Sequence, residues 1–238
     1  MNRFYIDAPL NVGESIDLTE TVFHHWIRVL RAKIGEFAIF FNGQGGEYVV
    51  ELTEINKKTA SVWVKSFDAI NRTLPLQVTI GQVMSKGDRL DYAIQKSVEL
   101  GVHTIQLLTS ERCEMRLKYD RDQKKLEHWQ SVAIASCEQC GMNIIPKVLA
   151  PLAVSDWVKQ CNAELKLVMA LSQNKVDLPQ PIPQQIAVLI GPEGGLSDHE
   201  IAFAHQQGFV AWTLGDRVLR TETAPVVALS ILGNMYAA

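Results

Sequence analysis

The chain has 238 residues, of which 47% are hydrophobic and 21% charged, and its 23 basic and 26 acidic side chains give a net charge of −3. This apolar content is too high for a disordered chain and is enough for one large or two small packed domains. No apolar run reaches the roughly 18 residues that cross a bilayer, and the first residues lack the apolar core of a secretion signal. We therefore expect a globular cytoplasmic protein without a membrane segment, and net charge alone does not indicate a nucleic-acid partner.

The first 70 or so residues are predicted to be rich in β-strands. Apolar residues at helical spacing indicate a short helix over 19–31. Three β-prone runs follow it, over 37–41, 48–52 and 60–64, at the spacing of a small sheet or barrel. A polar stretch then leads into Pro75, and we place a domain boundary there, between residues 1–72 and 73–238.

Beyond the boundary, β-prone runs alternate with helical stretches. Strands are predicted over 76–83, 104–108, 167–171, 186–190 and 210–214. Helices are predicted over 88–100, 120–140, 154–161, 197–207 and 224–236. Buried strands that alternate with helices indicate an α/β fold, with a parallel sheet and helices on both of its faces.

The four cysteines are Cys113, Cys137, Cys140 and Cys161. Without an export signal we expect them to be reduced thiols. Cys137 and Cys140 form the one close pair, but no histidine or second cysteine pair stands at metal-ligand spacing. Two small side chains on a helix are the favoured interpretation, and no metal is expected.

A glycine-rich loop follows the strand predicted over 186–190. It contains Gly191, Glu193, Gly194 and Gly195, and it ends where Ser197 and Glu200 stand at the spacing of a capping box. Loops at the carboxyl ends of parallel strands are where open α/β sheets bind ligands, and glycines let the backbone approach a ligand closely. A tight structural turn is the alternative, but the pattern favours a ligand role.

A second loop of this kind runs from Leu214 to Pro225, again between a predicted strand and a predicted helix. Arg220 and Glu222 stand beside the start of that helix, where an arginine adds to a field that already favours anions. A third loop, 172–174, follows the strand predicted over 167–171. Three loops at one edge of one sheet predict a ligand cleft.

The basic residues that occur outside these loops are clustered. Arg28 lies close to Arg31, Lys86 to Arg89, and Arg112 to Arg116. For any one cluster alone, a salt-bridged surface is the better interpretation. Lys96 and Glu99 are one helical turn apart, and an intrahelical ion pair stands at even odds with a substrate role for them.

These segments carry a family resemblance that extends along nearly the whole chain. The stretches include 25–31, 81–87, 94–102, 110–113, 135–141, 189–197 and 214–223, of which the last two are the most specific. They resemble the ribosomal RNA small subunit methyltransferase E family, in the SPOUT class of S-adenosylmethionine-dependent RNA methyltransferases. The resemblance implies a C-terminal trefoil knot, a PUA-like β-barrel over residues 1–72 that binds RNA, and a homodimer.

The resemblance also implies where the cofactor, S-adenosylmethionine, binds. It would lie in three loops of the knot. The residues expected to hold it are Met169, Leu171, Ser172, Ile190, Gly191, Glu193, Gly194, Gly195, Leu214, Gly215, Val218, Leu219 and Arg220.

The implied reaction is methylation of N3 of a uridine in the 16S rRNA of the 30S subunit. N3 of uracil carries a proton at neutral pH, so a base must remove it. Arg220 is the candidate to stabilise negative charge on the uracil oxygens or the phosphate, and Glu193 and Glu222 are the candidate proton acceptors. The expected phosphate contacts are Arg28, Arg31, Lys86, Arg112 and Arg116.

Three other functions compete with this one. Another RNA methyl transfer, to ribose 2′-O or to a different base nitrogen, fits the residue chemistry equally. A nicotinamide-dependent oxidoreductase is disfavoured because no Gly-x-Gly-x-x-Gly motif is present. A non-catalytic RNA-binding or ribosome-assembly factor is disfavoured because both specific loops are intact.

Overall fold

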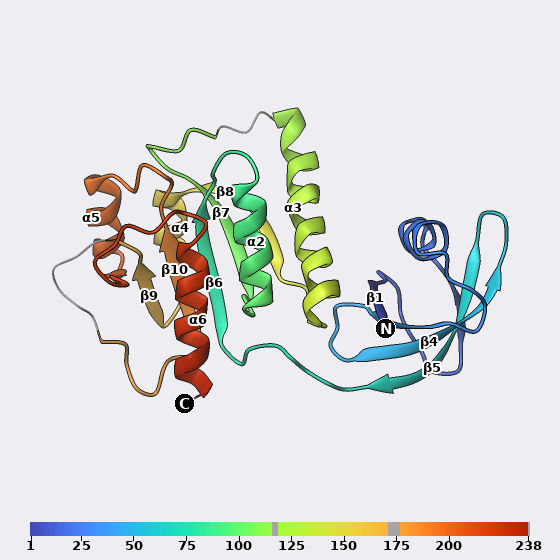
Figure 1. Ribbon diagram of the computed structural model, residues 1–238. Coiled ribbons are helices and arrows are strands. Elements are labelled where there is room, and N and C mark those ends of the chain that lie inside the picture. The colour runs from blue at the N-terminus through green and yellow to red at the C-terminus, as the bar shows by residue number, and fades with distance from the viewer. Residues whose placement is uncertain (116–118, 171–176, 238) are drawn as a thin grey trace. The chain divides into compact units, whose positions relative to one another are not determined.

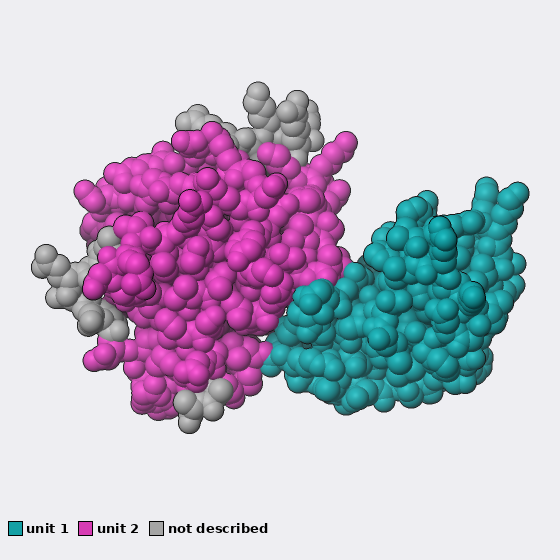
Figure 2. Space-filling view, in the orientation of Figure 1, with its two compact units in different colours: residues 1–73, 137–145 teal, residues 74–136, 146–238 magenta. Residues whose placement is uncertain are grey.

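The structure, a computed structural model, describes residues 1–115, 119–170 and 177–237 (Figure 1). It divides into two compact units, coloured separately in Figure 2. The first unit comprises residues 1–73 and 137–145, and the second comprises residues 74–136 and 146–238. The segment 137–145 thus belongs to the first unit, although it follows the expected boundary by more than sixty residues.

The first unit is built on a mixed five-stranded sheet. Its strands are β1 (Asn2–Tyr5), β2 (Ser15–Asp17), β3 (Phe37–Phe41), β4 (Glu47–Ile55) and β5 (Ala60–Asp68). They lie in the order β1-β3-β4-β5-β2, with β1 parallel to β3 and the other neighbours antiparallel. The three strands predicted here are confirmed, whereas β1 and β2 are too short to give a period-2 signal.

The predicted helix over 19–31 is only partly correct. A single turn, α1 (Glu20–Val22), leads into a π-helix, η1 (Phe23–Val29), in which the Leu30 N–H donates to the His25 carbonyl at 2.9 Å. Helical spacing detects the buried side of this segment but does not distinguish α from π winding. Trp26 is fully buried and contacts the rings of Phe4 and Phe40.

Segment 137–145 is held in the first unit by a charged network. Glu47 accepts hydrogen bonds from Arg3 at 2.6 Å and from Arg72 at 2.9 Å. Arg3 also donates to the Asn143 side chain at 2.6 Å, and the Tyr5 N–H donates to Glu138 at 2.9 Å. Burial alone would raise the pKa of the Glu47 carboxyl, but the two arginines outweigh it and lower this pKa.

The second unit contains a six-stranded sheet in the part of the chain that the structure describes. Its order is β11-β9-β10-β6-β7-β8, and every neighbouring pair is parallel, as predicted. The strands are β6 (Gln77–Val83), β7 (Thr104–Thr109), β8 (Lys147–Ala153), β9 (Leu165–Val168), β10 (Gln185–Ile190) and β11 (Val210–Ala211). The helices are α2 (Arg89–Glu99), α3 (Tyr119–Cys140), α4 (Val154–Gln160), α5 (Asp198–Gln206) and α6 (Ala224–Ala237), of which α3 ends in the segment 137–145 of the first unit.

Helices cover both faces of this sheet, α2 and α6 packing together on one and α4 and α5 on the other (Figure 1). Alternate side chains of β10 point to opposite faces of the sheet. Ala187 and Leu189 pack in the buried cluster that contains Trp157 of α4. Because β9, β10 and β11 are adjacent and parallel, the segments that follow them leave the sheet at the same edge. The site is built on that edge.

Neither a membrane-spanning helix nor a metal cluster is found among the described residues. None of their helices is long and apolar enough to cross a bilayer. No group of three or more potential His, Cys, Asp or Glu ligands occurs in the same ranges. The cysteines form no disulfide there, and burial raises the pKa of the Cys137 thiol to about 12.

Candidate active site

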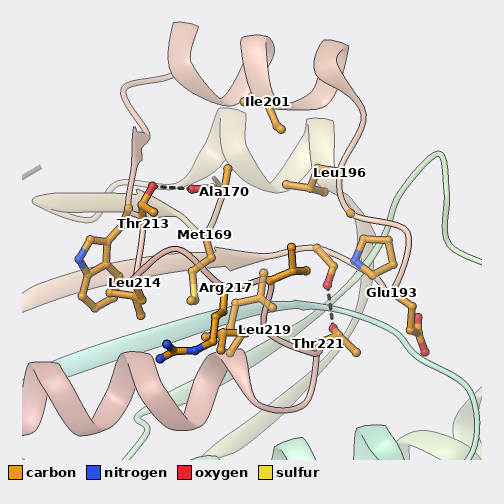
Figure 3. A pocket seen from close by; sticks show the side chains of 17 residues that line it. Met169, Ala170, Glu193, Leu196, Ile201, Thr213, Leu214, Arg217, Leu219 and Thr221 are labelled. Atoms are coloured by element: carbon orange, nitrogen blue, oxygen red, sulfur yellow. Dashed lines mark hydrogen bonds between the residues drawn. The ribbon is translucent and has the colours of Figure 1, made fainter. Parts of the chain in front are cut away.

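The loops that follow β9, β10 and β11 enclose a cavity of about 270 Å³ at the carboxyl edge of the sheet (Figure 3). Its lining is mostly apolar side chains and loop backbone, with the charged side chains of Glu193 and Arg217. The lining residues are Met169, Ala170, Ile190, Gly191, Pro192, Glu193, Gly195, Leu196, Ile201, Trp212, Thr213, Leu214, Arg217, Val218, Leu219, Thr221 and Ala224. An apolar lining with few polar groups is typical of a small-molecule site.

Local chemistry shapes the loop after β10. The predicted capping box is confirmed: Glu200 N–H donates to Ser197 Oγ at 3.1 Å, and Ser197 N–H donates to the Glu200 carboxylate at 2.9 Å. Gly195 has a φ of +69°, which favours glycine, and a Cβ on Gly191 would lie 3.0 Å from the Leu196 nitrogen. The loop is therefore folded tightly back on itself, and its glycines are required by the backbone.

A buried relay of hydrogen bonds ties the C-terminal loop to two strands. Gln82, fully buried at the carboxyl end of β6, donates to Thr221 Oγ1 at 3.0 Å. Thr221 donates in turn to the Gly191 carbonyl at 2.7 Å, the contact drawn in Figure 3. Gln82 was not among the predicted site residues. Its signal in the sequence is a polar side chain within an apolar strand run, which indicates a buried group that needs a partner.

A second link joins the segments that follow β9 and β11. Thr213 Oγ1 donates to the Ala170 carbonyl at 2.9 Å, also drawn in Figure 3. The segment after β11 thus takes part in both links, which join it to Gln82 of β6 and to the segments after β9 and β10. Its shape depends on side-chain to backbone contacts as well as on the sheet.

The structure brings most of the expected cofactor residues together. Those that line the cavity are Met169, Ile190, Gly191, Glu193, Gly195, Leu214, Val218 and Leu219. Gly194, Gly215 and Arg220 are not part of this lining, and Leu171 and Ser172 lie outside the described residues. Arg217, which was not singled out, supplies the cationic side chain of the cavity.

A larger open cleft of about 1060 Å³ adjoins the cavity, and we call it the outer cleft. Its lining residues are Lys86, Gly87, Asp88, Arg89, Tyr92, Arg112, Glu114, Glu193, Gly194, Glu222 and Thr223. Glu193 lines both spaces, and Thr221 of the cavity directly precedes Glu222 of the cleft. A ligand in the cavity and a ligand in the cleft would therefore be neighbours.

Ion pairs engage two of the three cations of the outer cleft. Arg89 contacts the Glu193 carboxylate at 2.9 Å. Lys86 contacts Glu114 at 2.6 Å, and this hydrogen bond raises the pKa of Lys86 and lowers that of Glu114. Arg112 instead donates to the carbonyls of Gly194 and Leu196 at 3.1 and 3.3 Å, so it braces the glycine loop.

The three candidate catalytic residues are placed differently. Glu193 and Glu222 both line the outer cleft, and Glu222 has a buried Oε2 with no hydrogen-bond partner in the structure. Arg220 lines neither space: its side chain is 78% exposed, with Nη1 3.9 Å from Glu222 Oε1. A buried carboxylate oxygen without a partner is costly and is most simply explained by a ligand that donates to it.

The candidate RNA contacts fall in both units. Arg28 donates to the Lys57 carbonyl at 2.5 Å and lies over the Phe23 ring in the first unit. Arg31 follows the π-helix with a φ of +57°, the only positive φ of a non-glycine among the described residues. Lys86 and Arg112 lie in the outer cleft of the second unit, and Arg116 is outside the described residues.

Lys96 and Glu99 of α2 form the intrahelical ion pair that their spacing predicts. Lys96 Nζ lies 2.7 Å from Glu99 Oε1 and 3.0 Å from Oε2. Both side chains are partly buried, and neither lines the cavity or the outer cleft. This contact satisfies the two charges locally.

Comparison with known families assigns both parts of the chain. Residues 72–233 match a family described as an RNA methyltransferase domain, and residues 18–63 match an RNA methyltransferase PUA domain. A parallel α/β sheet with a ligand cavity at its carboxyl edge, joined to a PUA-like domain, thus defines the RNA methyltransferase class.

Named relatives narrow this class. Proteins called ribosomal RNA small subunit methyltransferase E are 38% identical in Buchnera aphidicola from Schizaphis graminum and 30% identical in Bacillus subtilis. These alignments cover 97% and 98% of this chain, and 94% and 96% of the relatives. The chain belongs to the ribosomal RNA small subunit methyltransferase E family.

Solved structures agree with this assignment. The enzyme of the same name from Neisseria gonorrhoeae, bound to S-adenosyl methionine, has a TM-score of 0.93 at 36% identity over 99% of this chain and 98% of its own. A methyltransferase from Legionella pneumophila in complex with the same cofactor has a TM-score of 0.92, also at 36% identity, over 98% and 96%. The fold is therefore one on which S-adenosyl methionine has been seen bound.

Proposed function

We propose that this protein uses S-adenosylmethionine to methylate N3 of a uridine in the 16S rRNA of the small ribosomal subunit. The observation that carries the proposal is the apolar cavity at the carboxyl edge of the sheet, in a chain whose relatives of the same fold bind this cofactor. Family membership supports an rRNA substrate. The choice of uridine N3 rests on the resemblance of the two specific loops.

The residues around the cavity fit the cofactor. Apolar side chains such as Met169, Leu214 and Leu219 suit the flat adenine, and the exposed backbone of the glycine loop suits the polar groups of the molecule. Glu193 and Arg217 offer one charge of each sign to a methionine end that carries both. When bound, the cofactor supplies a methyl group activated by a sulfonium; the protein supplies orientation and electrostatics.

The protein itself must activate the methyl acceptor, the uracil base. N3 of uracil must lose a proton. Of the carboxylates that line the cleft, Glu193 also lines the cavity, and Glu222 directly follows Thr221 of the cavity. We assign the proton acceptor to this pair. Arg220, exposed beside Glu222, is assigned to the negative charge that develops on the uracil oxygens or to the adjoining phosphate.

The remaining assignments concern RNA and assembly. We propose that the PUA-like domain, residues 1–72, binds RNA through Arg28 and Arg31, and that Lys86, Arg112 and Arg116 of the domain 73–238 contact phosphates. For this, Lys86 must exchange Glu114 for a phosphate. The proposal includes a C-terminal trefoil knot, a homodimer and a cytoplasmic location, where the 30S substrate is.

The test is methylation of two substrates, assembled 30S subunits and naked 16S rRNA, with labelled S-adenosylmethionine and mass spectrometry of the nucleosides. We expect 3-methyluridine as the labelled product. A 2′-O-methylated nucleoside, or methylation of another base nitrogen, would instead support the alternative transfer. No methyl transfer to either substrate would contradict the proposed function.

A further inference from the structure

The outer cleft contains an aromatic side chain that none of the roles above uses. Tyr92 of α2 lines the cleft and is 46% exposed. Lys96 Nζ lies 5.9 Å from the centroid of its ring, which is a cation–π distance. A half-exposed aromatic ring in a cleft is a surface on which a nucleobase stacks, since every base has a π face.

The charges of the cleft favour a neutral ligand over a row of phosphates. Four carboxylates, Asp88, Glu114, Glu193 and Glu222, stand there against three cations. Two of those cations are already in ion pairs, whereas Arg112 donates hydrogen bonds to the backbone carbonyls of Gly194 and Leu196. Such a lining suits one base with its flanking phosphates, one near Arg112 and one at Lys86 once it releases Glu114, better than a longer run of phosphate backbone.

Glu222 requires a hydrogen-bond donor on the ligand. Its Oε2 is buried and accepts no hydrogen bond in the structure, although the residue is in the cleft lining. Ionised carboxylates only accept, so the missing partner is a donor. Uracil offers a ring N–H on its pairing edge, whereas the corresponding ring nitrogen of cytosine is an acceptor. The unused oxygen therefore distinguishes bases by the donor on that edge.

We propose that the outer cleft holds the acceptor base, a base with a ring N–H, which stacks on Tyr92 and donates that N–H to Glu222. This inference rests on the proposed function and adds to it the place of the base and the residue that positions it. Tyr92 is a positioning residue, since it contacts the face of the base and not the reacting nitrogen. The cleft adjoins the cofactor cavity through Glu193, as transfer requires.

The first test uses a pair of tyrosines with nearly equal exposure. Tyr92→Ala is expected to lower kcat/KM for the rRNA substrate about tenfold or more, because a stacking surface is lost. Tyr92→Phe retains the ring and is expected to stay within about twofold of the wild type. Tyr236→Ala is the matched control, because Tyr236 of α6 is 44% exposed and does not line the cleft.

A second test separates the base from the phosphates. Glu222→Gln is expected to lower kcat/KM at least tenfold while the slope of affinity against salt concentration stays that of the wild type. Asp156→Asn, on exposed α4 surface away from the cleft, is its control. A reduced salt slope for Glu222→Gln or Tyr92→Ala would contradict a contact with the base alone.

The outcomes keep the inference apart from the function on which it rests. Wild-type protein that transfers no methyl group to rRNA removes the proposed function. An active wild type with unchanged kcat/KM in Tyr92→Ala overturns only the inference. Weakened S-adenosylmethionine affinity in Tyr92→Ala also overturns it, since the ring would then be needed by the cofactor cavity. A molar mass of Tyr92→Ala that differs from the wild type in light scattering overturns it as well, since the ring would then belong to a subunit contact.

Discussion

Glu47 in the first unit and Glu222 in the second are buried to a similar degree, with side chains 11% and 15% exposed, but their surroundings differ. Glu47 lies between two arginines, and Arg3 beside it is only 13% exposed. Glu222 has one distant and exposed arginine and an oxygen without a partner. A carboxylate whose partners are internal stabilises the fold, whereas one left with an unused acceptor is available to a ligand.

Removing one arginine beside each carboxylate, Arg220 beside Glu222 and Arg3 beside Glu47, tests this comparison most strongly. Arg220→Ala is expected to lower methyl transfer about a hundredfold, the usual cost of one group that stabilises developing charge. Because its contact with Glu222 is long and exposed, the free energy of unfolding should change by less than about 1 kcal/mol. Steady-state kinetics and urea denaturation measure the two effects. Normal methylation with unchanged cofactor affinity would remove Arg220 from the mechanism.

Arg3→Ala should give the opposite result. It removes hydrogen bonds to Glu47 and Asn143, so we expect a loss of about 2–3 kcal/mol in the free energy of unfolding. The activity of each folded molecule should be unchanged, because Arg3 lines neither the cavity nor the outer cleft. Stability equal to the wild type would show that the Glu47 network is not structural.

The buried relay supplies a prediction of intermediate size. Thr221→Val leaves the Gln82 amide and the Gly191 carbonyl without their shared partner, and we expect S-adenosylmethionine affinity to fall about tenfold. Thr221→Ser should restore it, since the hydroxyl is kept. Thr53→Val, which removes an exposed hydroxyl in the first unit, is the control. Calorimetric titration gives these affinities, and wild-type affinity in Thr221→Val would exclude the relay from cofactor binding.

The smallest effect is a pH dependence. The Glu47 pKa is lowered in the folded protein, so its contribution is present above the ordinary carboxyl pKa, near 4.3, and is lost as pH falls through the lowered value. Glu47→Gln should therefore be less stable than the wild type at pH 7, and this difference should shrink steadily below about pH 4. Urea denaturation at several pH values measures it. A difference that is constant with pH would mean that ionisation of Glu47 is irrelevant.

Much of the second unit was predictable because its signals are local. Apolar runs and helical spacing located five of the six strands of the parallel sheet, and Ser197 with Glu200 marked the start of α5. The strand β8 was not predicted, because its run is interrupted by Pro151. The short β11 was overestimated, because the predicted run 210–214 continues past Ala211 into residues that line the cavity. Hydrophobicity does not distinguish a buried loop from a buried strand.

Contacts between distant residues were not predictable. Arg3 donates a hydrogen bond to Asn143, which lies 140 residues away in the chain, and Gln82 donates one to Thr221, which lies 139 residues away. Gln82 stands out as a polar residue in an apolar strand, but nothing in the sequence indicates its partner, and only the folded backbone brings the pairs together. The same holds for the outer cleft, whose residues come from α2, from the segments after β6, β7 and β10, and from the loop before α6.

The 139-residue separation between Gln82 and Thr221 also bears on how the protein folds. Closing so long a loop directly costs entropy, so we expect this hydrogen bond to form after β6 has paired with β10, which places Gln82 opposite Ile190. The cavity is complete only when strand β6, the glycine loop and the C-terminal loop have met. Cofactor binding therefore requires all three to be in place, and at a hundred times its Kd the cofactor would stabilise the finished unit by about 2.7 kcal/mol.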